Sequence, residues 1–250
     1  MEVILFDWGG TLAMVDRQAD ALRRGSMEAA GIVAGPNDSE AATRLLAAFF
    51  SAEAEAGADL VHREVDMWAV LARWASSTGR PVDAHRLAAA GQALGRAWTG
   101  SLDRVPGALE AVRWLRDRGY RLGLVSNCSI APDYCHQELA RQGFAGLLDL
   151  VVFSSEVGYR KPAAAIYEEA IRRAYPAGRP ADLSRVLFVG DSPALDVIAP
   201  AGMGMKTALV VREPGIWPEA DYARARPNLR INAVTELPAL LDRAGPDPGG

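Results

Sequence analysis

The sequence of 250 residues has few lysines, cysteines and histidines, and it has no long apolar run. No stretch approaches the ~18 apolar residues that a membrane-spanning helix needs, so no membrane partner is expected. The N-terminus has no basic segment leading into an apolar stretch, which argues against a secretory signal. We therefore expect a soluble, cytoplasmic protein.

The two cysteines, Cys128 and Cys135, can form at most one bridge and show no zinc-type spacing with histidine. We therefore interpret both as reduced thiols. The net charge is −4, and basic and acidic residues are interleaved, so no nucleic-acid partner is expected. Only Lys161 and Lys206 of the 27 basic residues are lysines.

Short apolar runs alternate with helical patterns at the N-terminus and again after about residue 105. The expected strands are residues 2–6, 120–127, 150–155, 185–192, 206–211 and 229–231. The expected helices are residues 107–118, 132–142, 163–174, a short one after Pro193, and 235–244, before a mobile tail GPDPGG. Such alternation predicts an α/β fold, a Rossmann-like doubly wound parallel sheet with helices on both faces.

The segment from residue 15 to residue 100 contains only helical patterns. One apolar stripe runs through Val61, Val65, Trp68, Ala72 and Ala75, and another through Leu87, Ala90, Leu94 and Ala97. About four helices are therefore expected to be inserted after the first strand. We predict a helical cap domain at residues 15–100 and an α/β core domain formed by residues 1–14 and 101–250.

Polar residues stand where the predicted strands end, at the edge where parallel sheets bind ligands. Asp7 follows the first strand, Ser126 and Asn127 end the second, and Asp191 ends a later one. Lys161 lies at the loop–helix junction after the third strand. Two carboxylates and an ammonium at one apolar edge are costly to bury unless a ligand or metal uses them.

Four motifs resemble those of the haloacid dehalogenase (HAD) superfamily of hydrolases with a helical cap after the first motif. DWGGT at residues 7–11 resembles the first motif, and SN at 126–127 the second. RKP at 160–162 resembles the third motif, and GDSPALD at 190–196 the fourth. One such motif alone is weak, but four in the family's order are specific, and they extend over most of the chain.

The resemblance implies that Asp7 is a nucleophile that forms an aspartyl-phosphate. It also implies Mg²⁺ as cofactor, held by the side chains of Asp7 and Asp191 and the backbone carbonyl of Gly9. Asp196 is expected behind these ligands, where it orients them.

Further roles follow from the same resemblance. Lys161 is expected to neutralise the nucleophile and the transferring phosphoryl group. The hydroxyl of Ser126 and the amide of Asn127 are expected to hold phosphoryl oxygens, and Thr11 to brace the turn after Asp7 and to contact the phosphate. Trp8 fits two roles equally well: stacking on a substrate or filling space beside the first strand.

Gly9 is a departure from the family pattern. Phosphatases of this superfamily usually carry a second aspartate two residues after the nucleophile, which protonates the leaving group and activates water. General acid–base catalysis is typically worth about 10²- to 10⁴-fold. A glycine leaves this role to the cap, to Asp16 or to water, or leaves it largely unfilled.

Two branches of the superfamily also lack that aspartate. Phosphonoacetaldehyde hydrolases resemble the first motif here but use a cap lysine, and the predicted cap has none. Haloacid dehalogenases need no metal and lack an acidic pair such as Asp191 and Asp196.

We therefore expect a Mg²⁺-dependent hydrolase, a phosphatase of a small phosphorylated metabolite that is either a phosphoric monoester or an acyl phosphate. The main alternative is a catalytically weak or inactive phosphate-binding or interaction protein, and dehalogenase or phosphonatase chemistry comes last. The sequence specifies neither the substrate nor the oligomeric state.

Overall fold

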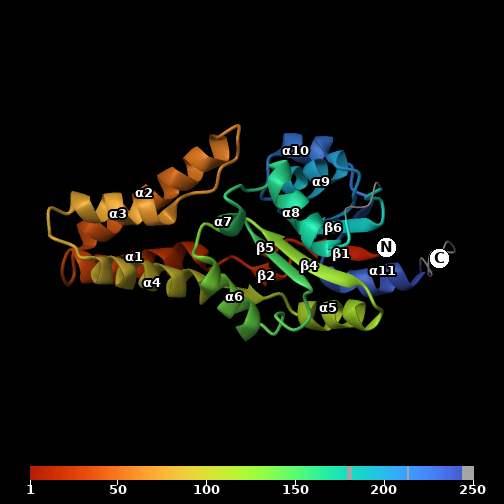
Figure 1. Ribbon diagram of the computed structural model, residues 1–250, viewed down its shortest axis with the longest axis horizontal. Helices are drawn as coiled ribbons and strands as arrows, with labels where there is room; N and C mark the ends of the chain where they lie inside the picture. The colour runs from red at the N-terminus through yellow and green to blue at the C-terminus, as the bar shows by residue number, and fades with distance from the viewer. Residues whose placement is uncertain (179–181, 213, 244–250) are drawn as a thin grey trace.

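A computed structural model describes residues 1–178, 182–212 and 214–243 of the chain (Figure 1). The predicted tail GPDPGG lies outside the described residues. Within the described part, no helix combines the length and the apolar character needed to cross a membrane.

A six-stranded, all-parallel sheet forms the centre of the larger lobe. Its strands, in spatial order, are β5 (Leu150–Phe153), β4 (Arg121–Ser126), β1 (Val3–Phe6), β6 (Val186–Gly190), β7 (Lys206–Val210) and β8 (Leu229–Ile231). Phe6 is in register with Leu124 on one side and Val189 on the other. Asp7 therefore leaves the sheet between the ends of β4 and β6, and the predicted α/β fold is confirmed.

Strand β1 is buried on both faces, which explains its uninterrupted run of apolar residues. Ile4 and Phe6 join one hydrophobic cluster, while Val3 and Leu5 join another on the opposite face. The first cluster includes residues of α5 (Ala108–Asp117), α6 (Pro132–Arg141) and α11 (Leu237–Arg243). The second includes α8 (Ala164–Ala174), so helices cover both faces of the sheet (Figure 1).

Several short elements differ from the predicted pattern. The third predicted strand ends at Phe153, because Ser154 begins the short helix α7 (Ser154–Val157), where Glu156 accepts a hydrogen bond from the Phe153 N–H. The predicted helix after Pro193 is a π-helix (Pro193–Ile198) that continues into α9 (Ala199–Gly202). A 3₁₀ turn (Val234–Glu236) precedes α11, and the sequence analysis missed α10 (Glu219–Arg224).

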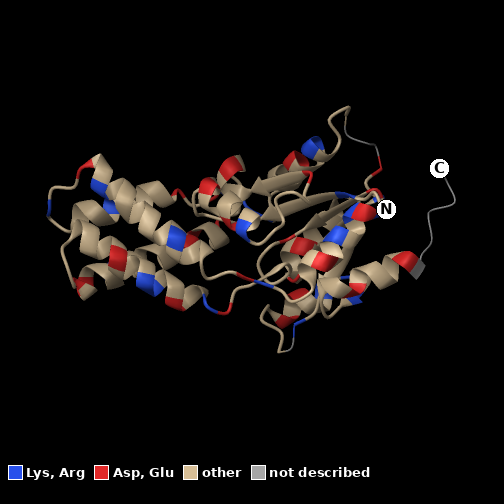
Figure 2. Ribbon diagram, turned by 90° about the horizontal axis from the view of Figure 1, so that it is seen from below, with Lys and Arg blue, Asp and Glu red and all other residues tan. Residues whose placement is uncertain are grey.

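Four helices inserted after β1 form the smaller lobe, on the left of Figure 1. They are α1 (Gln18–Val33), α2 (Ser39–Ala58), α3 (Met67–Ser77) and α4 (Ala84–Thr99). The two chain segments that connect the lobes pair as an antiparallel ribbon of β2 (Ala13–Met14) and β3 (Asp103–Arg104). Basic and acidic residues alternate over both lobes (Figure 2). The inserted helical region is as expected, while the division of the chain at residues 14 and 101 into two domains stays a prediction.

One predicted helical stripe is wrong at its beginning. Val61 and Val65 lie in the loop between α2 and α3, and Val61 is half exposed. The Asp59 carboxylate accepts hydrogen bonds from the N–H groups of Val61 and Arg63, which holds a turn there. Asp66 accepts a hydrogen bond from the Ala69 N–H, so it caps α3 and fixes its start.

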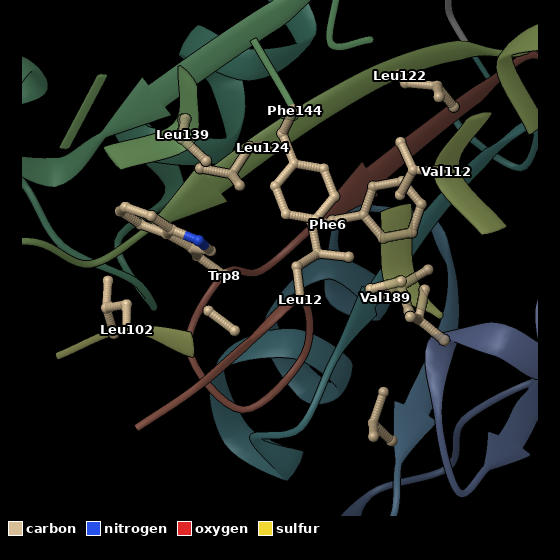
Figure 3. Close-up of a cluster of buried hydrophobic side chains, with 14 of the residues drawn as sticks. Phe6, Trp8, Leu12, Leu102, Val112, Leu122, Leu124, Leu139, Phe144 and Val189 are labelled. Atoms are coloured by element: carbon tan, nitrogen blue, oxygen red, sulfur yellow. The ribbon is translucent and has the colours of Figure 1, made fainter. Parts of the chain in front are cut away.

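Trp8 fills space in the core directly beside Asp7 (Figure 3). Its side chain is 1 % exposed, and its indole N–H donates to Oε1 of Gln142 at 3.2 Å. Its ring lies 6.0 Å from that of Trp98 and 5.8 Å from that of Phe153. Of the two roles considered for Trp8, the structure supports packing.

We predict that Trp8→Ala lowers the free energy of unfolding by about 3–5 kcal/mol, because it opens a cavity and removes a partner of Gln142. Urea denaturation measures this change. Trp68→Ala is the matched control, since Trp68 is 53 % exposed and its loss should cost about 1 kcal/mol or less. Equal losses in the two variants would contradict the packing role of Trp8.

Candidate active site

Three buried carboxylates meet at the carboxyl end of the sheet. Asp7 follows β1, Asp191 follows β6, and Asp196 lies in the π-helix after it. Each offers one oxygen, and these three oxygens lie within 4.8 Å of one another. The strand register brings two of these residues together, because Phe6 and Val189 are paired neighbours in the sheet.

Lys161 lies between two of these carboxylates. Its Nζ donates to Asp7 Oδ1 and to Asp196 Oδ1, both at 2.7 Å, and its side chain is 2 % exposed. Asn127 holds the backbone on both sides of this residue: its Oδ1 accepts from the Lys161 N–H at 2.7 Å, and its Nδ2 donates to the Lys161 carbonyl at 3.2 Å. The second and third sequence motifs are therefore directly linked.

The charges in this cluster do not balance. Burial favours a neutral lysine, but the charges of Asp196 and Asp7 outweigh it and raise the pKa of Lys161, so the ammonium form is kept. Burial, together with the charges of Asp7 and Asp196, raises the pKa of Asp191 to about 7. Burial and Asp7 also raise the pKa of Asp196 to about 6, against the opposing effect of Lys161. One ammonium faces three carboxylates, and a divalent cation would remove the excess negative charge.

The individual hydrogen bonds indicate which carboxylates fit such a cation. Both oxygens of Asp196 are engaged, Oδ1 by Lys161 and Oδ2 by the Ser192 N–H at 2.9 Å. The Oδ2 of Asp7 accepts only a long hydrogen bond of 3.5 Å, from Thr11. Asp191 Oδ2 accepts one of 3.3 Å, from Trp217. Asp7 and Asp191 are therefore better suited as ligands of a hard cation, with Asp196 as support.

Two glycines leave the space that these carboxylates occupy. A Cβ on Gly10 would lie 2.4 Å from Asp191 Oδ2, and Gly10 has φ +80°. A Cβ on Gly190 would lie 2.2 Å from the carboxyl group of Asp196. Any larger residue at either position would displace a carboxylate.

The remaining predicted site residues also lie at this edge. Ser126 is buried, and its hydroxyl lies 3.4 Å from the Asn127 carbonyl. Both polar atoms of the Asn127 carboxamide are occupied by the Lys161 backbone. At Gly9 an added Cβ would meet only Val15 Cγ1, at 3.0 Å. A Cβ at this position would therefore fit once Val15 moved by a few tenths of an ångström.

Trp217 is a site residue that the sequence analysis missed. It comes from the loop between β7 and α10, and its indole N–H donates to Asp191 Oδ2 at 3.3 Å. A Cβ on Gly215 would lie 3.2 Å from Tyr222 of α10, so the loop packs closely on that helix. No motif marks this tryptophan; its position follows only from the neighbouring strand and helix.

A cavity of about 400 Å³ opens above the carboxylates, between the two lobes. Trp217 and Ile216 line it on the core side, and Val15, Gln18 and Trp98 on the side of the cap. A second cavity of about 480 Å³ shares Val15, Gln18, Trp98, Asn127 and Arg160 with the first. Leu22, Phe49 and Phe50 make its cap wall apolar.

The cap also contacts the core beside Lys161. The Arg160 N–H donates to the His62 carbonyl at 2.8 Å, and the Glu64 N–H donates to the Gly158 carbonyl at 3.0 Å. The Arg160 guanidinium donates to Glu53 of α2 at 2.9 Å. The α2–α3 loop is thereby joined to the segment that leads into Lys161.

The chain thus combines a parallel α/β sheet with a buried acidic cluster and a buried lysine at the carboxyl edge of that sheet. Residues 1–204 match the family model of the haloacid dehalogenase-like hydrolases, and the chain belongs to this family. A glyceraldehyde 3-phosphate phosphatase from Methanothermobacter thermautotrophicus is 36 % identical over 129 residues, 51 % of this chain and 53 % of that protein. The pyrimidine 5'-nucleotidase YjjG from Escherichia coli is 31 % identical over 137 residues, 55 % and 56 % of the two chains.

The chain thus spans about half the length of the curated relatives it matches. Among solved structures, a 2-haloacid dehalogenase from Pseudomonas syringae pv. Tomato DC3000 aligns with a TM-score of 0.70 and 21 % identity. That alignment covers 98 % of this chain and 100 % of the other. At this identity the likeness concerns the fold alone.

We predict that Mg²⁺ stabilises the protein more at about pH 8 than at about pH 5. The folded-state pKa of Asp191, about 7, lies above its ordinary value of 3.8. The metal-free folded state therefore keeps a proton that the unfolded chain loses, and stability falls as the pH rises from about 4 to about 7. Mg²⁺ needs the ionised carboxylate, so its effect grows over the same range.

Urea denaturation with Mg²⁺ or with chelator measures this difference. At about 100 times its Kd, the cation should add roughly 2.7 kcal/mol at the higher pH. Asp191→Asn, which keeps the shape but not the charge, should lose most of the increment. An increment that is independent of pH or unchanged in this variant would contradict the prediction.

Proposed function

We propose that this protein is a Mg²⁺-dependent phosphatase that hydrolyses a small phosphorylated metabolite through an aspartyl-phosphate on Asp7. The observation that carries the proposal is Lys161 Nζ, 2.7 Å from both Asp7 and Asp196, with Asp191 in the same buried cluster. The names of the phosphatase and nucleotidase relatives support a small phosphorylated substrate.

Asp7 is the nucleophile in this proposal. Its carboxylate lies 2.7 Å from the Lys161 ammonium and attacks phosphorus, while the bond to the leaving oxygen breaks. Lys161 offsets the repulsion between the carboxylate and the phosphate, as a fixed positive charge in a buried site. The Ser126 hydroxyl and the Asn127 backbone N–H hold phosphoryl oxygens, and Thr11 supports the Asp7 carboxylate. Water then hydrolyses the aspartyl-phosphate and releases inorganic phosphate.

Asp7, Asp191 and the Gly9 carbonyl would hold Mg²⁺, and Asp196 would orient Lys161 and the loop at Ser192. When bound, the cation supplies positive charge that stabilises the phosphoryl oxygens.

Gly9 limits the substrates that this site handles well. Without an acid at this position, a leaving group that needs no protonation, such as that of an acyl phosphate, is favoured. Asp16 is the nearest alternative in the sequence, and it lines the neighbouring cavity. Its carboxylate, however, lies 3.5 Å from the Arg212 guanidinium.

Gly9 also motivates a second candidate function. A protein that kept the phosphate site but lost proton transfer would bind Mg²⁺ and phosphate without efficient turnover. Dehalogenation is the least supported alternative, because that chemistry needs no metal and this site clusters three carboxylates.

The test is a screen of phosphate esters and acyl phosphates with Mg²⁺. We expect turnover by the wild type and a loss of at least about 10³-fold in Asp7→Asn. No activity above this variant, with Mg²⁺ and phosphate still bound, would instead favour the binding protein. Halide release from 2-haloacids that is insensitive to chelator would favour a dehalogenase.

We further predict that Gly9→Asp raises turnover of esters with poor leaving groups by about 10²- to 10⁴-fold, because it supplies the missing general acid. The added Cβ requires only that Val15 move by a few tenths of an ångström. Gly9→Asn has the same size but no transferable carboxyl proton, and it should show no gain. Equal rates in the two variants, measured with an alkyl phosphate, would refute the explanation.

A further inference from the structure

The only two cysteines of the chain meet in the core beside the candidate phosphate site. Cys128 directly follows Asn127, and Cys135 lies in the first turns of α6. Both are free and buried, and their Sγ atoms lie 2.8 Å apart. Neither has a role in the proposed hydrolysis.

We propose that Cys128 and Cys135 are a reversible oxidation site, at which a small peroxide converts the two thiols into a disulfide. A disulfide has an S–S bond of about 2.0 Å, so the two sulfurs need to approach by only about 0.8 Å from their present separation. The seven-residue spacing alone does not predict this, because it becomes a contact only when α6 folds back against the end of β4.

The oxidant reaches the two sulfurs in a definite order. Cys128 lines the 480 Å³ cavity between the lobes, whereas Cys135 is fully buried behind it. Peroxide therefore first oxidises Cys128 to a sulfenic acid and is reduced to water. Cys135 then attacks that sulfur, the S–S bond forms, and a second water leaves. The two sulfurs together lose two electrons, which peroxide takes up, and a dithiol reverses the step.

Burial also makes the two thiols poorly reactive, so they stay reduced unless a small oxidant reaches them. It is the main cause that raises the pKa of the Cys128 thiol well above its ordinary value, and the hydrogen bond with Cys135 adds to it. Little thiolate exists at neutral pH, so oxidation is slow, and burial restricts it to an oxidant small enough to enter the cavity.

Oxidation would act on the site through the backbone of Cys128. Its N–H donates to Ser154 Oγ at 2.7 Å, and the preceding residue, Asn127, holds the Lys161 backbone. When the Cys128 sulfur moves toward α6, it displaces the backbone of residues 127–128. A displacement of about 1 Å in a catalytic site can lower the rate by up to about 10²-fold. This coupling, unlike the disulfide itself, rests on the proposed function.

The disulfide is tested by mass spectrometry after treating the native protein with hydrogen peroxide, then unfolding and alkylating it. Trypsin cleaves after Arg121 and Arg141, so one peptide, residues 122–141, carries both cysteines. After peroxide, we expect this peptide to be lighter than the reduced peptide by two hydrogen atoms and to carry no alkyl group. If dithiothreitol is added before alkylation, both cysteines should be alkylated. Two alkylated cysteines after peroxide, or sulfinic acid at Cys128 without a linked peptide, would overturn the site.

The coupling is tested by turnover of acetyl phosphate before and after peroxide. We expect a loss of about 10- to 100-fold in the wild type that dithiothreitol restores. Cys135→Ser and Cys135→Ala should keep the basal rate and lose the reversible response. A disulfide with unchanged turnover would overturn the coupling. A wild type without any turnover before oxidation would contradict the proposed hydrolase, while the peptide analysis still decides the disulfide.

Discussion

The buried ion pairs of Lys161 with Asp7 and Asp196 are the interaction on which the rest of the site depends. An ammonium that is 2 % exposed is tolerable only because two carboxylates lie 2.7 Å from it. The same carboxylates and Asp191 carry more negative charge than one ammonium balances, and a bound proton or cation would offset the excess. Removing Lys161 would leave three buried carboxylates without a positive partner, so the lysine and the carboxylates are constrained together.

A few structural features of the fold hold these charged groups together. Adjacent parallel strands bring Asp7 and Asp191 to one edge. Gly10 and Gly190 leave room for the carboxylates, and the Asn127 carboxamide fixes the backbone of Lys161. Each feature involves only a few residues, but together they define a site that no single strand or loop contains.

The sequence was sufficient for the parts of this arrangement that depend on periodicity and strand ends. The strand that ends at Asp7 and the inserted helices were predicted because apolar patterns report burial directly. The start of α3 was not, since Val61 and Val65 continue the apolar spacing, while Asp59 holds a turn after α2 and Asp66 caps the start of α3. Trp217 was missed because it reaches Asp191 from a loop without a motif. The sequence does not decide the role of Trp8, because this role depends on contacts with Gln142 and Trp98, which are distant in the sequence.

The contact between the α2–α3 loop and the core has a mechanical consequence. Arg160 is hydrogen-bonded to His62 and Glu53 of the cap, and the next residue along the chain is Lys161. A cap that swings away to admit a substrate must break these bonds or draw residue 160 along with it. Any movement of the cap relative to the core would therefore act on the peptide unit next to Lys161, whose ammonium lies 2.7 Å from Asp7.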